Sequence, residues 1–277
     1  MEFLIQPLTL PHIMADSYGF STTKDNAMVN ALLDTSAQRK FDGLVVFDPD
    51  GWMERTYSNQ LRLDSYRVKV FNTACFCTSA GYNPFVYAKS GISLTKFAAA
   101  FVSGTNGYKT PSGIKFISAE TALLTALFAY VSNQAPHHEQ NFSTVSEMLK
   151  CMCSAGESLP YDNDSFHTNA VDYMFDMLKC NKPQCLAVRR YDEFKNMKGL
   201  CPNMVIQSCI KRLEPLSNAV MDAYLLNDEL DLDSFGTDEF HKTVIFVHAG
   251  KSVNFDFLAS LLYTQLIDTL CFEIVNK

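Results

Sequence analysis

The chain has 277 residues, of which 47% are hydrophobic and 19% are charged, with 12 glycines and 10 prolines. This length fits one α/β body with an insertion or two modest domains, and the composition predicts no long disordered or collagen-like tract. The formal net charge of −7 argues against a protein that binds nucleic acid over its whole surface, although a local basic patch is still allowed.

The start of the chain does not have the pattern of a signal peptide, because Glu2, Gln6 and Pro7 interrupt its apolar residues. No uninterrupted apolar run reaches the roughly 18 residues that a membrane-spanning helix needs. The longest strongly apolar stretch, Ala122 to Val131, is much shorter. We therefore expect a cytoplasmic protein without a membrane span of its own.

Cysteine and histidine usage predicts no metal site. The chain has nine cysteines, an odd number that favours free thiols in a protein that is not secreted. Two C-x-C pairs, Cys75/Cys77 and Cys151/Cys153, do not match the C-x2-4-C knuckles of structural zinc sites. The adjacent His137 and His138 lie in a polar segment beside a proline, which is typical of a solvated turn.

The pattern of the first quarter of the chain predicts alternating strands and helices. An apolar-leaning stretch from Glu2 to Met14 predicts a first strand, and it is followed by a polar loop, Tyr18 to Asp25. The segment Asn26 to Arg39 then places its apolar residues near one helical face. A loop between a strand and a helix is where α/β folds bind phosphates.

A βαβ unit follows. Leu44 to Phe47 is a short apolar run typical of a buried parallel strand, and the turn residues Asp48 to Gly51 end it. Trp52 to Arg62 has helical character, and Tyr66 to Asn72 alternates like a half-covered strand.

The middle of the chain has helical periodicity, and its end returns to the α/β pattern. The predicted helices of the middle are Ala119 to Ser132, Gln140 to Cys153 with Ser143 as its cap, Asn169 to Lys179, Leu186 to Lys198 and Val205 to Leu213. A strand, Lys242 to His248, and a helix, Phe255 to Thr269, then follow. We predict an α/β body at 1–91 and 216–277, split by an all-α insertion at 92–215.

The loop from Tyr18 to Asp25 is a candidate phosphate site by position more than by pattern. Against the motif G-x-x-x-x-G-K-[ST], Lys24 fits the lysine position, but Thr23 replaces a glycine, Asp25 replaces the hydroxyl residue and Tyr18 replaces the first glycine. Thr23 restricts the backbone where a tight turn can need positive φ. Asp25 places negative charge near a polyphosphate. The motif alone favours an ordinary helix entry over a nucleotide site, and the position of the loop keeps the nucleotide site open.

Two further features have open alternatives. Asp48 follows a buried strand, where an α/β enzyme places an acid that faces a metal or orients water, but the preferred interpretation is a turn whose carboxylates satisfy backbone N–H groups. The residues with the highest basic density are Arg189, Arg190, Lys195, Lys198, Lys211 and Arg212. Acidic neighbours favour a solvated helix surface over a DNA track. Tyr191 and Phe194 are expected in the core, and no residue grouping supports a hydrolase.

Several segments together resemble the type IV secretion coupling proteins of the TraG class, especially those on conjugative elements of Gram-positive bacteria. The matching pieces, in family order, are VVFDPDG (45–51), KVFN (69–72), YNPF (82–85), AETALLTALFAY (119–130), EQNFSTVSEML (139–149), YDEFK (191–195), LDLDSFG (230–236) and FLASLLYTQLIDTL (257–270). The resemblance implies a RecA-like P-loop ATPase body interrupted by an all-α domain that recognises substrates.

The resemblance also implies site residues and partners. Gly19, Ser21, Thr22 and Lys24, with Thr23 and Asp25, would be the remnant of the nucleotide loop, and Asp48 belongs to the same candidate site. The implied cofactors are ATP and Mg²⁺, with weak or absent binding expected. The implied partners are a full-length coupling protein or a relaxase–DNA complex at the inner face of the membrane, and a homo-oligomer is open.

Three departures from the family affect the expected activity. The loop is degenerate, no N-terminal membrane anchor is present, and the sequence ends at Lys277, before the region of the family's second, acidic nucleotide motif. That acid manages Mg²⁺ and the attacking water. We therefore expect a non-hydrolysing adaptor or regulator. The alternatives are an ATPase subunit whose acid comes from another chain and a remnant without a present role.

Overall fold

The computed structural model describes residues 3–5, 43–108, 113–154, 169–235, 242–249 and 255–276. The predicted loop Tyr18 to Asp25 and the predicted helix Asn26 to Arg39 lie outside these residues. Contacts within the chain define two compact units, one made of 1–81 and 229–260 and the other of 82–228 and 261–277. Sequence periodicity places the corresponding boundaries at 91/92 and 215/216.

The first unit has an α/β fold around a four-stranded parallel sheet. Its strands are β1 (Phe3–Ile5), β2 (Gly43–Phe47), β3 (Tyr66–Asn72) and β4 (Lys242–His248). They lie in the order β1-β2-β4-β3, and every neighbouring pair is parallel. The predicted strands at Leu44 to Phe47, Tyr66 to Asn72 and Lys242 to His248 are confirmed, and β1 lies within the stretch predicted as a first strand.

Strand β4 occupies the middle of this sheet, although it comes last in the sequence. It pairs with β2 from Gly43↔Thr243 to Phe47↔Val247, and with β3 along its whole length. The run from Val244 to Val247 is completely buried, as expected for a parallel strand covered on both faces. The β2-α3-β3 segment is therefore a crossover whose two strands do not touch, because β4 lies between them.

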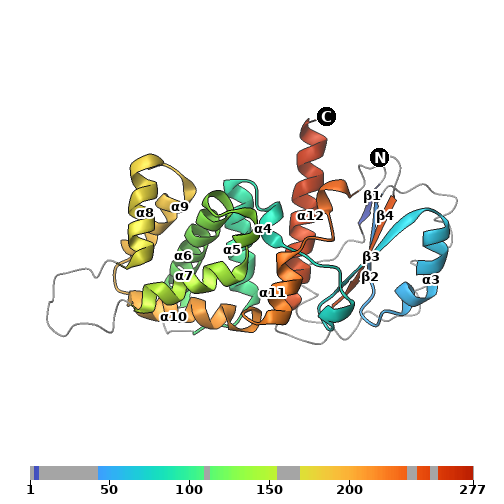
Figure 1. Ribbon diagram of the computed structural model, residues 1–277, viewed down its shortest axis with the longest axis horizontal. Helices are drawn as coiled ribbons and strands as arrows, with labels where there is room; N and C mark the ends of the chain where they lie inside the picture. The colour runs from blue at the N-terminus through green and yellow to red at the C-terminus, as the bar shows by residue number, and fades with distance from the viewer. Residues whose placement is uncertain are drawn as a thin grey trace. The chain divides into compact units, whose positions relative to one another are not determined.

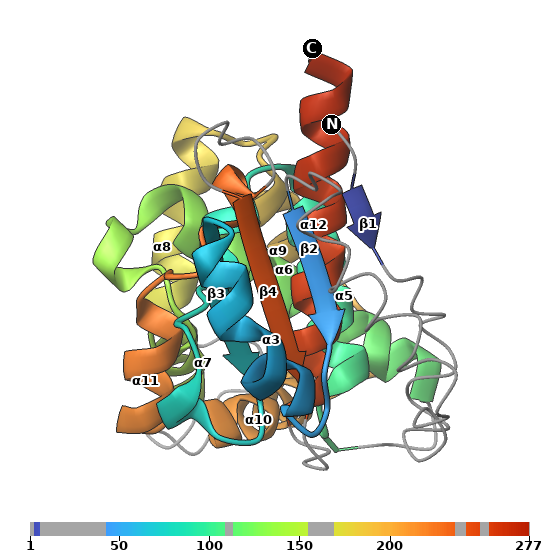
Figure 2. The ribbon, with the colours of Figure 1, turned by 90° about the vertical axis from the view of Figure 1, so that its right-hand side faces the viewer.

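Helix α3 (Trp52–Leu63) covers one face of the sheet (Figure 2). Alternate strand residues point toward it. The core on this face consists of Leu44, Val46, Met53, Leu61, Tyr66, Val244 and Phe246, with Tyr57 and Val68 packed against it. Gly43 faces the other side of the sheet, because neighbouring strand residues alternate between the two faces. The buried ring of Phe235 leaves no room for a side chain there, since a Cβ would lie 2.6 Å from Phe235 Cε1.

The second unit is helical (Figure 1). Its helices are α4 (Pro84–Tyr87), α5 (Gly91–Gly104), α6 (Gly113–Gln134), α7 (Phe142–Ser154), α8 (Ala170–Asn181), α9 (Leu186–Lys195), α10 (Pro202–Leu213) and α11 (Ala219–Leu226), with short 3-10 turns η2 (His137–Glu139) and η3 (Glu214–Leu216). Helix α12 (Asp256–Asn276) contributes its first turn to the α/β unit and the rest to the helical one. The predicted helices of this region are confirmed, with longer bounds for most of them.

Helix α6 is the core helix of the helical unit, packed against α5, α7, α9 and α10. Five buried phenylalanine rings cluster around it, with ring centroids 4.4–5.9 Å apart in stacked and edge-to-face pairs. They are Phe85, Phe97, Phe101, Phe128 and Phe142. By length and composition α6 could cross a membrane, but 67% of its most apolar window is buried inside the protein.

A buried ion pair joins α6 to α10. Arg212 and Glu120 form a bidentate pair, with Nε–Oε1 and Nη2–Oε2 distances of 2.9 and 2.8 Å, and both residues are almost completely buried. Arg212 Nη1 also donates to the carbonyls of Val102 and Thr105, and Ser208 Oγ donates to Glu120. The prediction of a solvated basic surface is therefore wrong for Arg212, because the acid that pairs with it lies far away in the sequence.

The rest of the basic segment matches a solvated surface. Arg190 pairs with Glu193, and Lys179 pairs with Asp192, all with partly exposed side chains. Lys195 reaches the buried Asp172, which also accepts a hydrogen bond from the Tyr191 hydroxyl. Tyr191 and Phe194 are buried as predicted.

Replacing Arg212 tests the role of the buried pair. We expect Arg212→Met to lower the free energy of unfolding by about 3–5 kcal/mol, because it leaves the Glu120 carboxylate buried without its partner. Arg190→Met is the matched control and should cost no more than about 1 kcal/mol, since its pair with Glu193 is partly exposed. Urea unfolding of both variants measures the difference. Equal costs would contradict this account.

Candidate functional site at the carboxyl edge of the sheet

One predicted site residue, Asp48, lies in the part of the chain that the structure describes. The other predicted residues lie outside it, namely Gly19, Ser21, Thr22, Thr23, Lys24 and Asp25. The site is therefore built from Asp48 and from the residues that surround it in the α/β unit. All of them lie where the parallel strands end.

Asp48 follows the last residue of β2 and is 3% exposed. Its N–H donates to the carbonyl of Val247 at 2.9 Å, so the ladder with β4 continues by one bond. Its Oδ2 accepts the N–H of Glu54 at 2.8 Å, in the first turn of α3. Gly51 begins that helix with a φ of 65°, which glycine adopts without strain. Asp48 thus caps α3, as the turn interpretation requires.

His248 at the end of β4 is the neighbour that sequence reasoning missed. Its Nε2 lies 3.5 Å from Asp48 Oδ2, an electrostatic contact rather than a well-formed hydrogen bond. The His248 carbonyl accepts the N–H of Thr73, which follows β3, at 3.0 Å. Gly51 packs against the imidazole, because a Cβ there would lie 3.1 Å from His248 Cε1. The three chain segments that leave β2, β3 and β4 therefore meet at this edge.

The charge on Asp48 is stabilised in the folded protein. Burial alone would raise the pKa of its carboxyl, but the adjacent His248 imidazole and the N–H groups of Glu54 and Met53 together lower that pKa below the ordinary value of 3.8. Asp48 is therefore an anion at neutral pH. When His248 is protonated, the two residues form a buried ion pair.

This arrangement suits the anchoring of helix α3 better than metal binding. Among the described residues, His, Cys, Asp and Glu side chains form no group of three or more that could bind a metal ion. Asp48 Oδ2 is already used by the N–H of Glu54 and faces His248.

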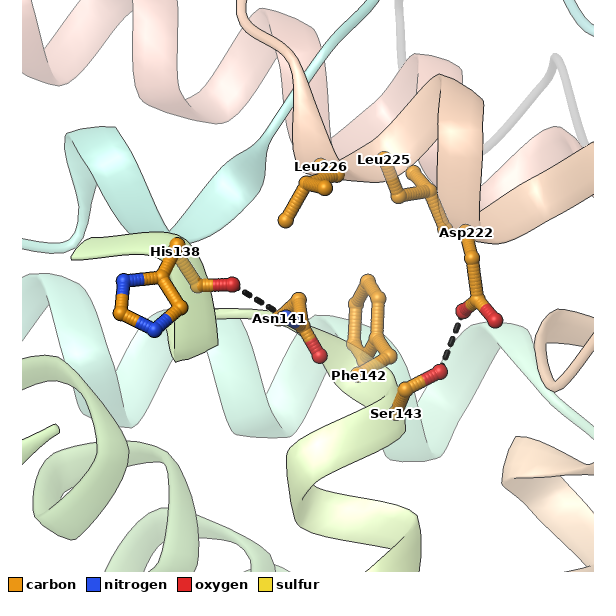
Figure 3. Close-up of a pocket in the computed structure, with 7 residues that line it drawn as sticks. All are labelled: His138, Asn141, Phe142, Ser143, Asp222, Leu225 and Leu226. Atoms are coloured by element: carbon orange, nitrogen blue, oxygen red, sulfur yellow. Dashed lines mark hydrogen bonds between the residues drawn. The ribbon is translucent and has the colours of Figure 1, made fainter. Parts of the chain in front are cut away.

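A pocket in the helical unit is lined by a serine and an aspartate on one side and by a histidine on the other (Figure 3). Its volume is about 230 Å³, and its lining is His138, Asn141, Phe142, Ser143, Asp222, Leu225 and Leu226. The Ser143 hydroxyl donates directly to the Asp222 carboxylate. The imidazole of His138 does not lie between them, and its backbone carbonyl accepts from Asn141. The pocket therefore lacks the relay that a serine nucleophile needs.

The same pocket corrects the predicted cap of α7. Asn141 Oδ1 accepts the N–H of Thr144 at 2.9 Å, so Asn141 is the capping residue. Ser143, predicted as the cap, lies inside the helix and binds Asp222 instead.

No family model matches the chain, and a comparison with curated proteins finds no match either.

The cap at Asp48 predicts a stability effect that depends on pH. We expect Asp48→Ala to lower the free energy of unfolding by about 1–2 kcal/mol at neutral pH, because α3 loses its cap. A carboxyl whose folded pKa is lowered stabilises the protein above its unfolded pKa and loses that effect as the pH falls through the folded value. The cost should therefore shrink as the pH falls below 3.8.

The exposed Asp50 in the same turn provides the control. Asp50→Ala should change the free energy of unfolding little at any pH. Urea titrations between neutral and acidic pH compare the two variants. A cost for Asp48→Ala that is constant with pH would contradict the stabilised charge.

Proposed function

We propose that this chain is a coupling-protein-like domain of a conjugation or type IV secretion system, which binds transfer substrates or a full-length motor without hydrolysing ATP itself. In this proposal the α/β unit is a RecA-like body and the helical unit is its inserted recognition domain. The observation that carries it is the position of β4. Strands β2 and β3 precede the helical segments, β4 follows them, and all three form one parallel sheet.

The chemistry of Asp48 supports the absence of hydrolysis. Asp48 directly follows the central strand β2. In α/β enzymes this is the usual place for an acid that binds Mg²⁺ or orients the attacking water. Its Oδ2 accepts the helix N–H of Glu54 and faces His248, and its side chain is buried. A metal ion would have to displace these contacts. The substitutions in the predicted loop, Thr23 and Asp25 above all, point the same way.

The helical unit offers apolar surface for a partner. Tyr173 and Met177 lie four residues apart on α8, and their exposed fractions are 66% and 49%. Residues at this spacing lie on the same helical face. Exposed aromatic and methionine side chains are enriched where proteins bind one another. This supports a recognition role for the helical unit.

A titration with Mg²⁺-ATP tests the proposal. We expect no detectable binding at millimolar ATP, and no difference between the native chain and Lys24→Ala, because the loop lacks the glycines that bring N–H groups to phosphates. Micromolar binding that Lys24→Ala abolishes would overturn the adaptor and favour an ATPase subunit whose catalytic acid comes from another chain.

Copurification completes the same test. The tagged chain, expressed with a coupling protein and its relaxase, should retain one of them after washing. Retention of neither would contradict an adaptor. The variant Tyr173→Ala/Met177→Ala should weaken retention, whereas Met204→Ala, an equally exposed methionine on α10, should leave it unchanged.

A further inference from the structure

The loop that follows β3 presents two thiols side by side. Cys75 and Cys77 are both exposed, and their sulfur atoms lie 2.8 Å apart. The two sulfur atoms are therefore in direct contact. The loop belongs to the carboxyl edge described above, since Thr73, two residues before Cys75, binds the carbonyl of His248.

Local hydrogen bonds fix the loop in this shape. Asn72 Oδ1 accepts the N–H groups of Ala74 and Cys75, and Asn72 Nδ2 donates to the Thr78 hydroxyl. The N–H and the hydroxyl of Thr78 both donate to the carbonyl of Cys75. The ring of Phe76, between the two cysteines, packs edge-to-face against Phe255. The two cysteines on either side of this anchored residue remain exposed.

A second C-x-C pair in the same chain is arranged differently. Cys151 and Cys153 lie on α7, where residues two apart do not face each other. Cys151 is exposed, whereas the sulfur of Cys153 accepts a hydrogen bond from Gln207 Nε2 at 3.1 Å. The spacing alone therefore does not bring two sulfurs together. The backbone conformation after β3 does so for Cys75 and Cys77.

The two thiols of the loop are not equivalent. The contact between the two sulfurs lowers the pKa of Cys75 and raises the pKa of Cys77. The adjacent polar groups of Thr78 lower the pKa of Cys75 further. The thiolate is the reactive form of cysteine, so Cys75 is the attacking group and Cys77 the resolving one.

We propose that Cys75 and Cys77 form a thiol–disulfide exchange site that takes small or exposed disulfides as substrates. The Cys75 thiolate attacks one sulfur of the substrate disulfide, whose S–S bond breaks, and the first substrate thiolate leaves and takes a proton from water. Cys77 then loses its proton to water and attacks the Cys75 sulfur, which expels the second substrate thiolate. The pair gives up two electrons and two protons, and the substrate disulfide becomes two thiols. A dithiol reverses the cycle.

The inference does not depend on the proposed adaptor function. Thiol–disulfide exchange requires an accessible thiolate and a second thiol close to it, and this exposed pair provides both. The first step needs an accessible Cys75 sulfur, and the second needs Cys77 to reach Cys75, which the separation of the two sulfurs provides.

Oxidised glutathione is the probe for the test, added to the full chain and followed by mass spectrometry of the peptides that contain each pair. We expect the native chain to form a Cys75–Cys77 disulfide, seen as the loss of two hydrogen atoms. Cys77→Ser should instead accumulate a stable glutathione adduct at Cys75, because the resolving thiol is missing. The Cys151/Cys153 peptide of the same sample is the internal control and should form no internal disulfide.

Alkylation by iodoacetamide at neutral pH supplies an independent readout on the reduced chain. Cys75 should react about tenfold faster than Cys180, which is exposed on α8. Circular dichroism checks that Cys77→Ser is folded. A lasting adduct at Cys75 in the native chain, an equally fast disulfide between Cys151 and Cys153, or equal alkylation of Cys75 and Cys180 would each overturn the proposal.

Discussion

The pairing of β4 with both β2 and β3 is the constraint on which the α/β unit depends. Without β4 the two earlier strands have no common partner, because they do not pair with each other. The strand that joins them comes from residues 242–248, after all the helices from α4 to α11. Pairing across so long a segment costs chain entropy, which the buried strand core of Val244 to Val247 must offset.

The same pairing gathers the polar residues of the carboxyl edge. Parallel strands end on one side of a sheet, so Asp48, Thr73 and His248 come together only when β4 is in register between its neighbours. Asp48 then meets the first turn of α3 as well as the imidazole, and the cysteine loop leaves from the adjacent strand end. The candidate site is thus a consequence of one strand register, whereas local hydrogen bonds shape the cysteine loop beside it.

Local patterns in the sequence predicted most elements, whereas partners distant in the sequence were not predictable. Apolar runs and periodicity located β2, β3, β4 and the long helices, because each reflects the burial of its own residues. The insertion of β4 between β2 and β3 depends on sheet order, which no single segment encodes. For the same reason the burial of Arg212 against Glu120 and the contact of His248 with Asp48 were missed. For the contact between His248 and Asp48, the signal in the sequence was the histidine at the end of the predicted strand Lys242 to His248.

Hydrogen exchange of the backbone amides tests the central claim most directly. If β4 joins β2 and β3, the amides of Val244 to Val247 should be the most protected of the sheet, and those of β2 and β3 should become exposed together with them in one cooperative step. Fast exchange throughout β4 while β2 and β3 remain protected would contradict the account, because the two earlier strands would then be stable without it.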